Sequence, residues 1–437
     1  MHVYFSGIGG SGIAPLALIA KQAGYQVSGS DGRPSQYLEY LKKHGIADTH
    51  MGVDRDFIAA VHAKQPIDWF VYGSAQPMDF PDHPEFAFCQ ENHIKISKRD
   101  EFLSRIITDK KLKLVAVAGT HGKTTATAMA VWLFKQLGIP VSYSVGGKIN
   151  FGETGQFDPA SKYFVYEADE YDRNFLSFYP EIALIAGIDW DHPDIYPSRE
   201  EYYAAFRQFL SQSRQNFIWR GDAKKLAVPA SDSVTLIDEQ DPQIDKQVVL
   251  AGHVNRLDAW LVATGLVKPL DKPAPELVAV LNKFPGLARR FEQLAPNLYT
   301  DYAHTPAKIR GALQMAREIL TGGTLAGKVV VVYEGLHNTR QHFIKDQLAD
   351  LFDGVKQLYI VPSYLAREDP KLELLTPEKI LDLLSNSTKG HAAAAQLNDD
   401  LASKIRQHTA DGDLVLCFSA GSGDSLDEWL RKTFAPR

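Results

Sequence analysis

Residues 112–125 read Leu-Lys-Leu-Val-Ala-Val-Ala-Gly-Thr-His-Gly-Lys-Thr-Thr, and the rest of the predicted fold is arranged around them. An apolar run ends at Gly119 and a helix-forming segment begins after Thr125, so the pattern predicts a buried strand, a tight loop and a helix. Such a loop suits a polyphosphate, because glycines let the backbone come close and the helix N-terminus adds a positive dipole. We expect Lys123 to reach the outer phosphates and the Thr124 hydroxyl to suit Mg²⁺; a glycine-rich turn with a surface lysine is the plain alternative.

The loop departs from the full Walker pattern, which needs a glycine where Val117 stands. Its spelling, Gly-Thr-His-Gly-Lys-Thr-Thr, resembles the ATP loop of the Mur ligases, the ATP-dependent amide-forming enzymes of peptidoglycan synthesis. This resemblance implies that ATP is a substrate and Mg²⁺ a cofactor. It also implies ATP contacts from every residue of the loop, namely Gly119, Thr120, His121, Gly122, Lys123, Thr124 and Thr125.

The composition is that of an ordinary globular protein. At 437 residues, the prior of roughly 100–200 residues per domain suggests about three domains. The formal net charge of −6 argues against a nucleic-acid partner, because no basic excess is present to neutralise phosphates. No apolar stretch reaches about 18 residues, and no leader-like segment opens the chain, so we expect no membrane partner. The two unpaired cysteines, Cys89 and Cys417, suit a reducing compartment, and we expect a cytoplasmic protein.

A second glycine loop, Gly-Ile-Gly-Gly-Ser-Gly, lies between a predicted strand and a helix near the start of the chain. Together with Asp31 after the next strand, it suggests a dinucleotide site and, taken alone, a dehydrogenase; a loop used for packing is the plain alternative. Hydride transfer has no use for the ATP-type loop, and the segment is also similar to the Mur ligase domain that holds the diphosphate of a UDP-sugar. That resemblance implies UDP-sugar contacts from Gly9, Gly10, Ser11, Gly12, Asp31 and Ser74.

Two acidic segments follow predicted strands beside the phosphate loop. The strand at 163–166 runs into Glu-Ala-Asp-Glu-Tyr-Asp. A carboxylate at the end of a strand beside a phosphate loop is well placed to bind Mg²⁺. A solvated acidic turn is the alternative interpretation. The resemblance implies that Glu167 is this Mg²⁺ ligand, together with Thr124. The later segment Asp-Trp-Asp-His, which follows the predicted strand 182–188, is similar to a second metal segment of the family, and His192 is therefore implied to bind a second Mg²⁺.

Family motifs recur in the second half of the chain. In Gly-His-Val-Asn-Arg-Leu-Asp-Ala, Asn255 is implied to read adenine, although Val254 and Asp258 stand where His and Asn are usual; a helix cap is the alternative. Arg290 is implied to hold charge of the γ-phosphate, for which its planar guanidinium is suited; a surface arginine pair is the ordinary explanation.

The last motifs belong to a third predicted domain. Asp-Tyr-Ala-His-Thr-Pro resembles a family signature, with Thr305 where a second His is common, and implies that Asp301 and His304 reach the nucleotide. A degenerate loop further along implies substrate contacts from His337 and Arg340.

Strands alternate with helices along the chain, which predicts an α/β fold with parallel or mostly parallel sheets. We expect a Rossmann-like UDP-sugar domain at 1–108, a central P-loop-type ATPase domain at 109–293, and a C-terminal Rossmann-like, amino-acid-binding domain at 294–437.

The resemblance implies an ATP-dependent ligase. The lactyl carboxylate of UDP-N-acetylmuramate attacks ATP, and the amine of L-alanine attacks the resulting acyl phosphate, with Lys123, His192 and Arg290 as the catalytic groups. The preference for L-alanine rests on the N-terminal glycine loop and on His121; a family member that attaches a whole tripeptide to the same sugar nucleotide is the alternative. An ATP-responsive scaffold with a degenerate site is an alternative of another class. We expect a monomer or a weak homodimer.

Overall fold

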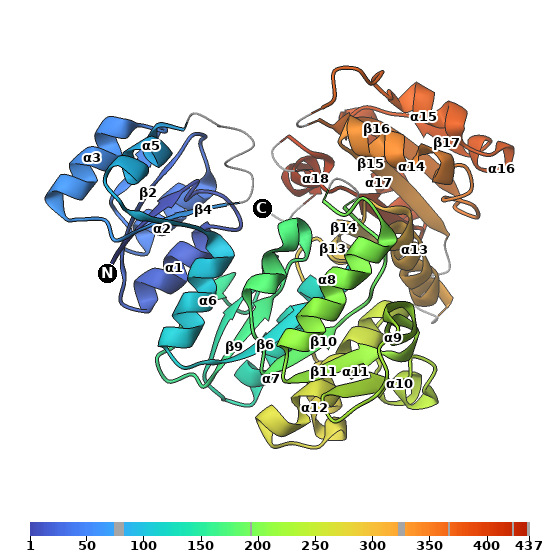
Figure 1. The fold of residues 1–437 in the computed structure, drawn as a ribbon. Helices are drawn as coiled ribbons and strands as arrows, with labels where there is room; N and C mark the ends of the chain where they lie inside the picture. Colours follow the sequence, from blue (N-terminus) through green and yellow to red (C-terminus); the bar gives the residue numbers. More distant parts are fainter. Residues whose placement is uncertain (74–82, 193–194, 322–327, 366–367, 422–423, 435–437) are drawn as a thin grey trace. The chain divides into compact units, whose positions relative to one another are not determined.

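The computed structural model describes residues 1–73, 83–192, 195–321, 328–365, 368–421 and 424–434. The chain divides into two compact units, and Figure 1 shows the helices and strands that form them. One contains Met1–Val248 and Leu257–Phe284, and the other contains Val249–Arg256 and Pro285–Arg437. The first unit holds two sheets and the second holds one.

The N-terminal sheet has five parallel strands in the order β3-β2-β1-β4-β5. Its strands are β1 (His2–Ser6), β2 (Gln26–Asp31), β3 (Thr49–Met51), β4 (Trp69–Tyr72) and β5 (Lys95–Lys98). The helices of this part are α1 (Ala14–Gln22), α2 (Gln36–Lys43), α3 (Arg55–Lys64), α5 (Pro84–Glu91) and α6 (Arg99–Asp109). The strand order reverses at β1, and ligands of such open sheets bind outside the carboxyl ends of the strands at this point. The glycine loop after β1 therefore lies where the Rossmann-like prediction requires it.

The second sheet has seven strands in the order β12-β11-β10-β6-β9-β7-β8, and only the short β7–β8 pair is antiparallel. Its strands are β6 (Lys113–Ala118), β7 (Val141–Ser144), β8 (Gly155–Gln156), β9 (Tyr163–Glu167), β10 (Ile182–Ile185), β11 (Gln215–Trp219) and β12 (Val234–Ile237). The accompanying helices are α7 (Lys123–Gln136), the 3₁₀ segment η1 (Tyr171–Ser177), α8 (Arg199–Gln212), α9 (Arg220–Leu226), α10 (Pro242–Gln247), α11 (His253–Leu270) and α12 (Ala274–Leu281). The apolar strand β6 lies in the middle of the sheet, with only Lys113 at its start partly exposed.

The third sheet has the order β13-β14-β18-β15-β16-β17 and is parallel except for the β13–β14 hairpin. Its strands are β13 (Glu292–Ala295), β14 (Leu298–Asp301), β15 (Val329–Leu336), β16 (Gln357–Tyr364), β17 (Ala392–Ala394) and β18 (Leu414–Phe418). Its helices are α13 (Pro306–Thr321), α14 (Asn338–Ile344), η2 (Lys345–Gln347), α15 (Pro377–Leu383), α16 (Asn386–Lys389), α17 (Asp399–Ala410) and α18 (Leu426–Phe434).

The α/β architecture with three mostly parallel sheets confirms the predicted fold class. In the first unit, one apolar cluster includes Val3 and Phe5 of β1 as well as Leu114 and Phe164 of the second sheet. The boundaries predicted at 108/109 and 293/294 remain predictions. Within the part of the chain that the structure describes, no helix combines the length and the apolar character that a membrane crossing requires.

Candidate functional site

The predicted strand–loop–helix is present as β6, residues 119–122 and α7. Two of the loop's residues must be glycine. Gly119 has a φ of +137°, and a Cβ there would lie 2.7 Å from the carbonyl oxygen of Gly187. Gly122 has a φ of +76° immediately before α7, a conformation that residues with a Cβ rarely adopt. The loop therefore has the backbone that a phosphate cradle needs.

Thr120 fastens the loop to the segment that follows β10. Its N–H donates to the carbonyl oxygen of Gly187 at 2.6 Å, and its hydroxyl lies 2.6 Å from the carbonyl oxygen of Asp189. The Tyr202 hydroxyl is 2.7 Å from the same oxygen of Thr120. The Thr120 side chain therefore fixes the shape of the loop through contacts within the protein.

The ammonium of Lys123 lies against the loop and between acids. It donates to the carbonyl oxygen of Gly119 at 2.7 Å and to the Glu170 carboxylate, and it lies 3.8 Å from an oxygen of Asp169. Burial alone lowers the pKa of Lys123, but Glu170 and Asp169 outweigh that effect and the pKa is raised. Lys123 is therefore a buried cation, and the sequence motif did not reveal Glu170 as its partner.

The Glu167 carboxylate, at the end of β9, faces the start of α7. Its oxygens accept from the Thr124 hydroxyl at 2.8 Å and from the N–H of Gly146 at 2.7 Å. Burial raises the pKa of Glu167, opposed by the charge of Lys123 and by both hydrogen bonds. A hydroxyl and a carboxylate are hard oxygen donors, and Mg²⁺ is usually held by one or two carboxylates together with substrate phosphates and water. The pair Thr124 and Glu167 therefore fits Mg²⁺.

His192, the predicted ligand of a second Mg²⁺, lies beside two acidic residues. Its Nε2 is 3.8 Å from an oxygen of Glu170 and 3.9 Å from one of Asp191. Its Nδ1 is buried with no hydrogen-bond partner among the described residues, and its φ is +57°. Among those same residues, no group of three or more His, Cys, Asp or Glu side chains is arranged to hold a metal ion. The second metal site predicted at His192 thus remains a prediction.

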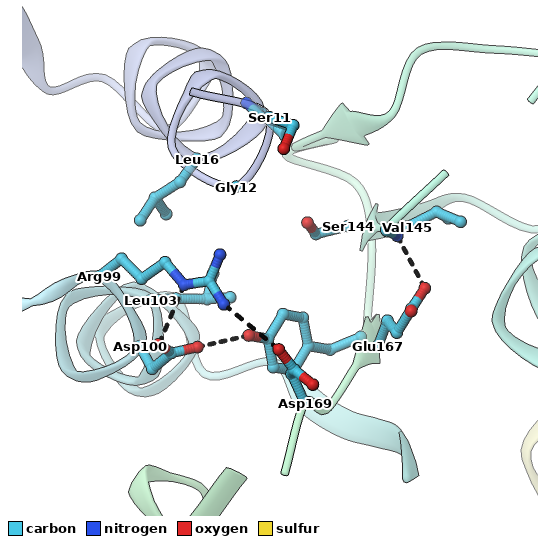
Figure 2. Close-up of a pocket in the computed structure, with 13 residues that line it drawn as sticks. Ser11, Gly12, Leu16, Arg99, Asp100, Leu103, Ser144, Val145, Glu167 and Asp169 are labelled. Carbon is cyan, nitrogen blue, oxygen red and sulfur yellow. Dashed lines mark hydrogen bonds and ion pairs between the residues drawn. The ribbon is translucent and has the colours of Figure 1, made fainter. Parts of the chain in front are cut away.

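A cavity of about 230 Å³ lies between the N-terminal glycine loop and the carboxyl ends of β7 and β9 (Figure 2). Its lining residues are Ser11, Gly12, Pro15, Leu16, Arg99, Asp100, Leu103, Ser144, Val145, Gly146, Tyr166, Glu167 and Asp169. It therefore brings the predicted UDP-sugar loop and the predicted magnesium ligand to one space.

Arg99 is a residue of this cavity that the sequence analysis missed. Its Nε donates to Asp100 at 3.1 Å, and its Nη2 lies 3.9 Å from an oxygen of Asp169 (Figure 2). A Cβ on Gly12 would overlap the Arg99 guanidinium, so the glycine makes room for it. Burial by itself lowers the pKa of Arg99, but the charge of Asp100 and other acidic groups raises it overall. The one available signal was position, because α6 begins directly at the carboxyl end of β5.

Asp31 holds the N-terminal glycine loop. Its carboxylate accepts from the N–H of Gly9 at 2.8 Å and from that of Arg33 at 3.0 Å. The Ser35 hydroxyl donates to the carbonyl oxygen of Gly9 at 2.6 Å. Gly10 and the cavity residues Ser11 and Gly12 follow in the same loop, whereas Ser74, the remaining predicted contact, lies outside the described residues.

In the second unit, His304 lies among cations. Its Nε2 is 3.5 Å from Nη1 of Arg340, and its Nδ1 is 3.0 Å from the carbonyl oxygen of Tyr302. Burial lowers the pKa of His304 to about 3, with further lowering from Lys308, Arg340 and Arg290. The structure thus brings the predicted residues Arg290 and Arg340 to the imidazole of His304, together with Lys308, which the motifs did not indicate. A cluster of this charge suits an anion.

Other predicted residues of this unit have structural contacts. The Asp301 carboxylate accepts from the N–H groups of Ala303 and Phe291, both at 2.7 Å, and burial raises its pKa. His337 lies 3.6 Å from Glu368 rather than in the cationic cluster. The Asn255 amide donates to the carbonyl oxygen of Ala251 at 2.9 Å, as a residue in the first turn of α11.

Comparison with known proteins gives three consecutive family matches. They are the Mur ligase family catalytic domain over residues 2–111, the Mur ligase middle domain over 117–243, and the Mur ligase glutamate ligase domain over 289–421. A UDP-N-acetylmuramate–L-alanine ligase of Clavibacter michiganensis is 30% identical over 456 residues, covering 96% of this chain and 90% of that protein.

Solved structures agree in fold. The UDP-N-acetylmuramate–alanine ligase of Thermotoga maritima matches with a TM-score of 0.71 at 22% identity, covering 97% of this chain and 96% of that one. A murein peptide ligase of Psychrobacter arcticus matches with a TM-score of 0.58 at 20% identity, covering 99% and 98%. At these identities the two likenesses concern the fold alone.

Proposed function

The chain belongs to the Mur ligase family, and from this premise we propose that it joins UDP-N-acetylmuramate to L-alanine with consumption of ATP. The observation that carries the proposal is the cavity in which the glycine loop faces Arg99 and Glu167. A sugar nucleotide held by that loop would place an acid beside the phosphate-binding loop, which is the arrangement that carboxylate phosphorylation requires.

The nucleotide end of the site is assigned to the phosphate loop. Lys123 and the amides at the start of α7 offset the charge that spreads over a phosphoryl group in transfer. Thr124 and Glu167 would hold Mg²⁺, which neutralises phosphate charge. In this structure the Lys123 ammonium donates to the Glu170 carboxylate. Bound phosphates would therefore replace carboxylate oxygens as its partners.

Arg99 is assigned to the acid of the sugar nucleotide. Its guanidinium stays protonated and offers a planar pair of donors to a carboxylate or phosphate. Its position beside Asp169 and Gly12 supports a role in orienting that acid, because the surrounding acids fix the side chain before any ligand arrives.

The cationic cluster of the second unit is assigned to an anionic group of the incoming amino acid or of the nucleotide. Arg290, Lys308 and Arg340 supply the charge, and His304 remains neutral. A histidine whose pKa is about 3 is too weak a base to take a proton from an ammonium at neutral pH, so His304 serves as a hydrogen-bonding group.

The remaining residue roles stand as part of the same proposal. They are ATP contacts from Gly119, Thr120, His121, Gly122, Thr125, Asn255 and Asp301, a second Mg²⁺ at His192, UDP-sugar contacts from Gly9, Gly10, Ser11, Gly12, Asp31 and Ser74, and a substrate contact from His337. A monomer or weak homodimer is proposed on the same footing.

The choice of amino acid is tested by one assay. We expect phosphate release with UDP-N-acetylmuramate, ATP and Mg²⁺ when L-alanine is supplied, and little release with the tripeptide L-alanyl-γ-D-glutamyl-meso-diaminopimelate. The name of the curated relative favours L-alanine. The reverse preference would replace this function with that of a peptide-recycling ligase, and release that does not depend on the amine would contradict both.

A further inference from the structure

Asp258, on α11, is a buried acid without a partner. It is 1% exposed, and neither carboxyl oxygen has a hydrogen-bond partner among the described residues. Burial raises the pKa of Asp258 well above its ordinary value, and no charged group contributes to that shift. An ionised carboxylate in such a place is costly, and this favours the neutral acid.

This carboxyl lies directly against the phosphate loop. A Cβ on Gly122 would overlap the Asp258 carboxyl, and the same Cβ would lie 3.0 Å from the side chain of Ala186. Gly122 precedes the first residue of α7, so the acid lies at the helix end whose first N–H groups have no partner within the helix. In the proposed function, these amides bind the phosphates of ATP.

The charged groups around Asp258 are directed elsewhere. On the loop, the Lys123 ammonium is engaged by Gly119 and Glu170. On its own helix, Arg256 pairs with Glu318 at 3.0 Å. The segment after β10 approaches Gly122 through the uncharged Ala186. His121 is the remaining titratable group of the loop. An ionised Asp258 would therefore find its nearest donors in the loop amides.

We propose that Asp258 is an internal competitor for the phosphate loop: its carboxylate takes the amides at the start of α7 that a nucleotide requires, and its neutral acid leaves them available. The inference rests on the proposed function of this loop in binding ATP. Both a phosphate and a carboxylate are drawn to a helix N-terminus by the same dipole and N–H groups, so they exclude each other there. Where an amide stands in place of this acid, no such competition arises.

The consequence is that nucleotide binding depends on one proton. Above the pKa of Asp258, affinity for a nucleotide falls by up to about tenfold per pH unit, because binding must first return the carboxyl to its neutral form. Asp258→Asn keeps the shape of the side chain and cannot ionise. It therefore removes this dependence while leaving binding at neutral pH intact.

Calorimetric titration with ADP and Mg²⁺ at pH 7 and pH 9.5 tests this. We expect the affinity of the unmodified chain for ADP to fall more steeply between the two pH values than the affinity of Asp258→Asn. The matched control is Asp222→Asn, because Asp222 is also buried with a raised pKa but accepts hydrogen bonds from Lys225 and Ile188. That variant should keep the pH dependence of the unmodified chain.

A second control, His121→Asn, removes the other titratable group of the loop and should likewise keep the pH dependence. Parallel declines in the unmodified chain and in Asp258→Asn would overturn the competitor assignment, as would loss of the pH dependence in His121→Asn. If the unmodified chain bound no ADP at either pH, the proposed function of the loop would fail instead, so the two failures are distinguishable.

Discussion

Lys123 has a structural task as well as a chemical one, because its ammonium is the charged partner of the buried Glu170. Removing one member of a buried ion pair costs about 3–5 kcal/mol, since the other charge is left uncompensated. Lys123→Ala should therefore lower the free energy of unfolding in urea as well as reduce turnover by about 100-fold or more. Adding Glu170→Gln should restore most of the stability and none of the turnover. A double variant that regains turnover would contradict the role given to Lys123 in phosphate binding.

The sequence could predict that residues within one contiguous motif share a site. It could not predict contacts between residues that are far apart in the chain. Lys123 and Thr124 are neighbours in one loop, so their spacing was enough to place them together. Arg99 has no motif, and its contact with Asp169 joins positions 70 residues apart in the chain. Glu170 was visible as one acid among four, but its pairing with Lys123 depends on how β9 lies beside β6.

The β6–loop–α7 element depends on close packing of its first glycine. Gly119→Ala places a methyl group 2.7 Å from the carbonyl oxygen of Gly187, whereas Gly138→Ala at the far end of α7 has a φ of +67° and nothing within 4 Å. Both variants suffer backbone strain of roughly 1–2 kcal/mol, and only the first adds overlap with backbone. We expect Gly119→Ala to be the less stable in urea unfolding and to lose ADP binding, with Gly138→Ala binding normally. Equal behaviour of the two would contradict the packing argument.

The ends of a strand were predictable where an apolar run stopped at a loop residue. They were not predictable where the apolar run continues beyond the last residue of the strand. The run 182–188 predicts one strand, but β10 ends at Ile185. The N–H of Ala186 still bonds to β6, at 2.9 Å from the carbonyl oxygen of Ala118, and the carbonyl oxygen of Gly187 then accepts from the N–H of Thr120 in the phosphate loop. The polarity of the side chains does not indicate which backbone groups these residues bond to.

The fate of one oxygen atom tests the reaction proposed for the molecule as a whole. If the lactyl carboxylate attacks the γ-phosphate and the amine then expels phosphate, one carboxyl oxygen leaves with that phosphate in each turnover. UDP-N-acetylmuramate labelled with oxygen-18 in this carboxylate should therefore yield labelled orthophosphate by mass spectrometry. Arg340→Ala should raise the KM for L-alanine, yet every phosphate it releases should still carry the label. Label in AMP would instead indicate adenylyl transfer, in which the carboxylate attacks the α-phosphorus and pyrophosphate leaves, and would contradict attack on the γ-phosphate.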